Sequence, residues 1–79
     1  MLHLIKNDEG VLLTDGGFTR NTLSEKYKVG EAVADDKITQ FIADKEIDYI
    51  EGMLRIKTDL NSAITEIMYL YWAIQSLLE

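Results

Sequence analysis

The densest group of side chains able to bind or catalyse is a cluster of acids in the middle of the chain, made of Asp44, Glu46, Asp48 and Glu51. Carboxylates at this spacing are typical of a calcium loop, which needs glycine at its sixth position and an acid at its twelfth. Counting from Asp44, those positions hold Tyr49 and Arg55, so the calcium loop fails. No apolar pattern around the acids indicates the buried pair that acid–base catalysis requires. We expect a solvated charged turn.

The remaining reactive side chains do not form a catalytic or metal-binding set. His3 is the only imidazole and the chain has no cysteine, so a zinc set is incomplete. The sequence has no nucleophile–base motif near Ser24, Ser62 or Ser76, and the glycines match neither a phosphate-binding loop nor a dinucleotide motif. The sequence therefore predicts a protein that is not an enzyme and binds no cofactor or metal.

The charge of the chain is negative and unevenly distributed. The formal net charge is −6, and the middle of the chain carries an acidic face, whose expected members are Glu31, Asp35, Asp36, Asp44, Glu46, Asp48 and Glu51. Residues 58–79 contain three acids and no base, which excludes a basic helix for membrane surfaces or phosphates. We expect no membrane binding and no direct binding to nucleic acid. One hypothesis is that the acidic face mimics nucleic acid, as small phage-type inhibitors do.

Length and composition predict one small domain over residues 1–79. Without cysteine there is no disulfide, so stability must come from packing or oligomerisation. The apolar residues 2–5 are too short for a signal peptide, and the longest apolar run, residues 67–74, is too short to span a bilayer. We expect a cytoplasmic protein.

The first half of the chain predicts a hairpin followed by two short helices. Residues 2–5 and 11–14 flank a turn-forming segment and predict the hairpin. Thr22 and Glu25 have the spacing of a capping box, which predicts a helix ending near Gly30. Asp35 and Asp36 are the candidate N-caps of the next helix, with Lys45 at its end.

Residues 47–57 fit two structures. Their apolar residues alternate, and Glu51-Gly52 is able to turn a second hairpin, which we favour. The alternative is one long helix over residues 44–79, since a heptad-like apolar spacing continues through this segment. Gly52 and a helix-start signal at Thr58-Asp59 argue against that helix. The predicted fold class is α+β: N-terminal hairpin, two short helices, second hairpin and long amphipathic C-terminal helix.

Residues 19–57 resemble a winged helix. Residues 23–30 are similar to its first helix and turn, Ile38, Phe41 and Ile42 to the core of its second helix, and residues 47–56 to its wing. The resemblance implies a DNA-binding regulator, for which Arg20, Lys26 and Lys28 are the available bases. However, the second helix carries acids where DNA readers carry lysine or arginine, which fits a protein-docking module better.

The C-terminal helix carries more apolar surface than one small core requires. The residues predicted to face the core are Leu60, Ala63, Ile64, Ile67, Leu70, Tyr71, Ile74, Leu77 and Leu78. Met68, Tyr69 and Trp72 lie off this stripe and have the composition of an interface. We therefore expect a protein-binding module that self-associates as an oligomer or docks on a larger protein through Met68, Tyr69 and Trp72. The partner is a protein, a second copy, or both.

Overall fold

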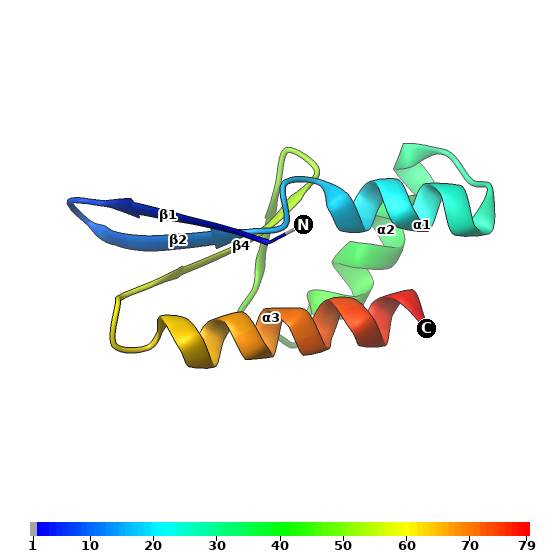
Figure 1. The fold of residues 1–79 in the computed structure, drawn as a ribbon. Coiled ribbons are helices and arrows are strands. Elements are labelled where there is room, and N and C mark those ends of the chain that lie inside the picture. Colours follow the sequence, from blue (N-terminus) through cyan, green and yellow to red (C-terminus); the bar gives the residue numbers. More distant parts are fainter. Residues whose placement is uncertain (1) are drawn as a thin grey trace.

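The computed structural model describes residues 2–79 and confirms the predicted α+β fold class (Figure 1). The elements are, in order, β1 (His3–Asn7), β2 (Gly10–Thr14), α1 (Phe18–Tyr27), α2 (Glu31–Ile42), β3 (Asp48–Ile50), β4 (Met53–Thr58) and α3 (Ala63–Leu78). The predicted elements thus appear in the predicted order.

The four strands form one antiparallel sheet in the order β1-β2-β4-β3. Strands β3 and β4 form the predicted second hairpin, so the alternative of one long helix over residues 44–79 is wrong. Glu51 and Gly52 both have positive φ, 54° and 77°, as a tight hairpin turn requires. Glycine adopts this conformation without strain, and a Cβ at Gly52 would lie only 2.6 Å from Arg20 Nη1.

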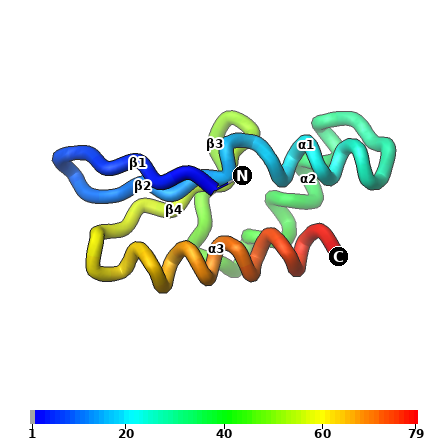
Figure 2. Tube along the Cα trace, in the orientation of Figure 1, coloured from blue at the N-terminus to red at the C-terminus, as the bar shows by residue number. Residues whose placement is uncertain are grey.

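One face of the sheet forms the core together with α3. Leu13 lies opposite Leu4 on β1 and Ile56 on β4, so these side chains share a face. Leu13 and Ile56 are buried, whereas every residue of the edge strand β1 is exposed. Helix α3 runs along β2, β4 and α1, from the hairpin end of the molecule to its helical end (Figure 2).

Helix α1 begins four residues before the predicted N-cap, Thr22, which lies half-buried inside the helix. The reason is Asp15, whose side chain accepts hydrogen bonds from backbone amides at the start of the helix. Its Oδ1 accepts from the Gly17 amide and its Oδ2 from the Thr19 amide, each at 3.0 Å. The predicted capping box at Thr22 and Glu25 is therefore wrong, because an earlier carboxylate already binds the free amides.

Helix α2 begins at Glu31, not at the predicted caps Asp35 and Asp36. Lys28, with a φ of 53°, ends α1, and the chain turns directly into α2 through Gly30. Those predicted caps are wrong because both residues lie one turn inside the helix. Lys45 does act at the end of α2, where its Nζ donates to the Phe41 carbonyl at 2.9 Å.

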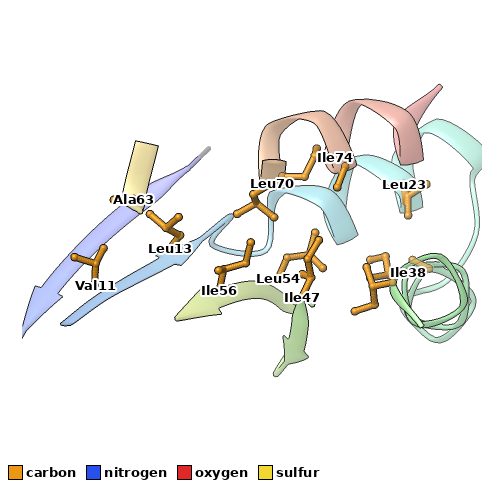
Figure 3. Packing of buried hydrophobic residues seen from close by; sticks show 13 residues of the cluster. Val11, Leu13, Leu23, Ile38, Ile47, Leu54, Ile56, Ala63, Leu70 and Ile74 are labelled. Carbon is orange, nitrogen blue, oxygen red and sulfur yellow. The ribbon is translucent and has the colours of Figure 1, made fainter. Parts of the chain in front are cut away.

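Buried apolar residues from all three helices, from strands β2 and β4, and from the segment before β3 meet in one core (Figure 3). The core residues are Val11, Leu13, Leu23, Ala34, Ile38, Ile42, Ile47, Leu54, Ile56, Ala63, Leu70, Ala73 and Ile74. Leu70 and Ile74 of α3 lie near its centre, between the sheet and α1. The inner side of α3 is thus committed to folding.

Candidate protein interface

Helix α3 has a buried inner side and an exposed, apolar outer side. Ala63, Leu70, Ala73 and Ile74 are the buried residues of the inner side. The outer face, as we define it, consists of Ile64, Met68, Tyr71 and Trp72. Their exposed fractions are 73%, 67%, 49% and 54%. At about 100° per residue, positions 64, 68, 71 and 72 lie on one side of a helix.

The outer face is broader than the sequence predicted. Met68 and Trp72 were expected there, and both are exposed. Ile64 and Tyr71 were expected on the buried stripe, as was Leu60, which precedes the helix and is 60% exposed. These three assignments to the core are wrong. The sheet and α1 bury only a narrow arc of α3, so the edge of the predicted stripe faces solvent.

Tyr69, the third predicted interface residue, lies at the margin of the outer face. It is half-buried and packs against the core. Its ring stacks on Trp72, with centroids 6.1 Å apart and planes 17° apart. Tyr69 therefore supports the Trp72 ring from one side and leaves much of the rest exposed.

The outer face carries no charge. Between Ala63 and Leu78 the helix has one charged residue, Glu66, which is half-buried and lies away from the outer face. The exposed polar neighbours, Thr65 and Gln75, are uncharged. A charge-free apolar surface is typical of the centre of a protein interface. The near absence of charge from residues 63–78 is the sequence signal that would have indicated Ile64 and Tyr71.

An apolar groove lies beside α3, between this helix and β1. It has a volume of about 220 Å³, and its lining residues are Leu2, His3, Leu4, Leu13, Ile67 and Leu70. His3 thus lies at a strand edge beside a groove. Ile67 is close in position to Ile64 and Tyr71 on the helix surface, so the groove borders the outer face.

The acidic residues do not act as one free surface, because Arg20 binds two of them. Arg20 Nη1 lies 2.8 Å from Glu31, and Arg20 Nη2 donates to Asp35 at 3.0 Å. Tyr49 also donates its hydroxyl to Asp35. Burial, followed by this hydrogen bond, raises the pKa of the Tyr49 phenol above its usual range.

The other acidic residues are exposed. They are Asp36, Asp44, Glu46, Asp48 and Glu51. Asp44 pairs with the neighbouring Lys45 at 3.0 Å, and the hydrogen bond and charge of Lys45 lower the pKa of Asp44. The Lys45 side chain is mostly covered, whereas the Asp44 side chain is 83% exposed, so the pair leaves the Asp44 carboxylate accessible to other molecules.

Two of the bases considered for DNA binding make contacts within the chain. Arg20 links α1 to α2 through its acidic partners, and Lys26 donates to the Leu78 carbonyl at the end of α3. Lys28 is exposed. Arg20 and Lys26 thus join helices to one another, and none of the three bases lies on α2.

Within residues 2–79 no group of histidine and acidic side chains is arranged to hold a metal ion. Over the same residues, no helix is both long and apolar enough to cross a membrane. The chain matches no family model, no curated protein and no solved structure. The arguments about function therefore rest on the surface itself.

Proposed function

We propose that this chain is a non-enzymatic protein-interaction module that self-associates or docks on a larger protein through the outer face of α3. One observation supports this: four large uncharged side chains, each about half exposed or more, lie on one side of a helix. An apolar patch of this size is about the largest that a typical monomer exposes, and such patches are often functional. The proposal keeps the cytoplasmic location expected from the cysteine-free composition.

The size of the surface is adequate for binding. Side chains of this size at these exposures present on the order of 500 Å². At about 25 cal/mol per Å², their burial more than offsets several kcal/mol of lost translational and rotational freedom. Trp72 is the expected hot spot, since it is large, apolar and supported by Tyr69.

The proposal is tested by asking whether the outer face is covered in the cells that make the protein. The chain has no cysteine, so Gln75→Cys introduces a single thiol beside Tyr71 and Trp72 without removing an apolar side chain. Thr39→Cys, on the exposed surface of α2, is the matched control. A membrane-permeant maleimide is applied to cells and to dilute purified protein.

We expect the thiol at position 75 to react at least about tenfold more slowly in cells than in dilute solution, because partner contacts exclude the reagent. The thiol at position 39 should react equally in both. Equal reaction of both thiols in both settings would contradict the proposal.

Two other classes have weaker support. An acidic inhibitor keeps the five exposed acids that Arg20 does not contact, but Arg20 binds Glu31 and Asp35. Its binding to a basic protein should weaken steeply with salt, whereas binding through the outer face should respond little. A winged-helix regulator would have to bring the exposed acids of α2 close to the phosphates of DNA, with Lys28 as an exposed base beside them. Binding to duplex DNA at low salt is the test of this class.

A further inference from the structure

We propose that the occupant of the outer face is a second copy of this chain, with the two α3 helices antiparallel about a two-fold axis at Met68. This inference rests on the proposed function, because it names the partner of the same surface. The argument uses the spacing of the outer face, its charge and its area.

The apolar residues are placed symmetrically about Met68. Ile64 lies four residues before Met68 and Trp72 lies four residues after it. In an antiparallel pair centred on Met68, a two-fold axis sets Ile64 of one copy near Trp72 of the partner subunit, and the reverse. A short branched side chain then meets a large flat ring at both ends, while the two Met68 side chains meet at the axis.

Charge restricts where and in which direction a second copy can bind. Each copy carries −6, so two copies repel each other, and the repulsion is weakest where both surfaces are free of charge. The outer face is such a surface. A parallel pair would set Asp59 beside Asp59 and align the two helix dipoles.

An antiparallel pair avoids both costs. It brings Asp59, before the start of α3, toward the end of the partner's α3. That end is where Lys26 donates to the Leu78 carbonyl. Opposite dipole ends then lie close together at both ends of the pair, where Lys26 and Glu79 of the partner subunit place one charge of each sign near Asp59.

The area is close to what a stable dimer needs. The outer face presents on the order of 500 Å², against about 800 Å² for each partner in an interface of standard size. Leu60, also exposed, precedes Ile64 by one helical turn, and the groove beside β1 borders the other edge. These two neighbours supply the remaining apolar area.

The experiment pairs opposite charges across the proposed contact. Ile64→Lys and Trp72→Glu are made separately, and both positions are exposed, so folding should be retained, as checked by circular dichroism. Sedimentation measures each variant alone and an equal mixture of the two. Thr39→Lys, on α2, is the control for adding a charge elsewhere.

We expect wild type and Thr39→Lys to form dimers and each face variant alone to dissociate at least about tenfold more readily. The mixture should recover a heterodimer, because lysine at 64 then meets glutamate at 72 while the other Ile64–Trp72 contact stays intact. An equal mixture of Ile64→Lys with Ile64→Glu should not recover it, since these positions do not face each other in the antiparallel pair.

Other outcomes overturn the inference. Recovery by the pair at position 64, and not by the 64/72 pair, would indicate parallel helices. Face variants that dimerise like wild type would place the contact elsewhere. A wild type that stays monomeric at every concentration would exclude a second copy. If wild type is monomeric but the thiol at position 75 is still protected in cells, the outer face binds a different protein. Failure of the dimer is thus distinguishable from failure of the proposed function.

Discussion

Two surfaces of the molecule differ in their side-chain contacts: the surface around α1 and α2, and the outer face of α3. On the first surface, Arg20 binds Asp35, which also accepts a hydrogen bond from Tyr49. On the second, Met68 and Trp72 are exposed, and within residues 2–79 no side-chain hydrogen bond or ion pair holds them. One surface completes its own interactions, and the other leaves apolar area in water.

This difference separates the residues that build the fold from those available to a partner. Surface ion pairs contribute little energy but fix how α1 and α2 meet. The exposed part of an apolar side chain, by contrast, gains free energy only when a partner covers it. Changing residues on the two sides of α3 and in the polar contacts should therefore produce distinguishable effects.

The largest effect should come from the inner side of α3. Leu70 is fully buried, so Leu70→Ala should lower the free energy of unfolding by about 2–5 kcal/mol. The loss should be similar at every protein concentration, because the cavity lies within one chain. Urea unfolding at low and high concentration measures it. A loss seen only at high concentration would mean that Leu70 acts in the interface.

On the outer face the expected effect depends on concentration. If association stabilises the fold, wild-type stability should rise by up to about 2.7 kcal/mol per hundredfold increase in concentration. Trp72→Ala should flatten that dependence and leave the dilute protein nearly unchanged. Melting curves at two concentrations measure both. Coincident wild-type curves would make Trp72 an ordinary exposed residue.

Among the polar contacts, Asp15 should matter most. Asp15→Ala leaves the amides of Thr19 and Leu54 without their acceptor in a buried place, at a cost of about 2 kcal/mol. Chemical unfolding measures it, with Asp8→Ala in the exposed first turn as the control. Equal stability of the two variants would show that Asp15 is dispensable.

The smallest effect should come from Tyr49, and it should depend on pH. Tyr49→Phe removes the hydrogen bond to Asp35 and should cost about 1 kcal/mol near neutral pH. The pKa of Tyr49 is raised above the ordinary 10.0, so its contribution is present below about pH 10 and is lost as pH rises further. Unfolding of both proteins from pH 7 to 11 tests this. A stability difference that grows above pH 10 would contradict the sign.

The sequence predicts the strands and helices well because their signals are local. Glu51-Gly52 specifies the second turn, as predicted. Asp59 accepts from the Ser62 amide at 2.8 Å in the turn before α3, but the helix begins at Ala63 and not at Leu60, as the start signal at Thr58-Asp59 had indicated. The starts of α1 and α2 were wrong because several residues had capping chemistry. Only tertiary structure shows that Asp15 caps α1 and that Asp35 turns toward Arg20.

The candidate site was predicted in part, for a physical reason. An apolar stripe around a helix shows that the helix is covered, but not how wide an arc this domain covers. Met68 and Trp72 were far enough from the stripe to be recognised. Ile64 and Tyr71 lie at its edge, and their exposure depends on where the small sheet ends.

The carboxylate of Asp15 also links parts of the chain that are far apart in sequence. It accepts a hydrogen bond from the amide of Thr19 in α1 and another from the amide of Leu54 in β4, which lies 39 residues after Asp15. When β4 leaves the sheet, Asp15, which caps α1, loses its hydrogen bond from the Leu54 amide. The start of α1 and the second hairpin should therefore open as one cooperative unit, and the amides of Thr19 and Leu54 should exchange with solvent at matching rates.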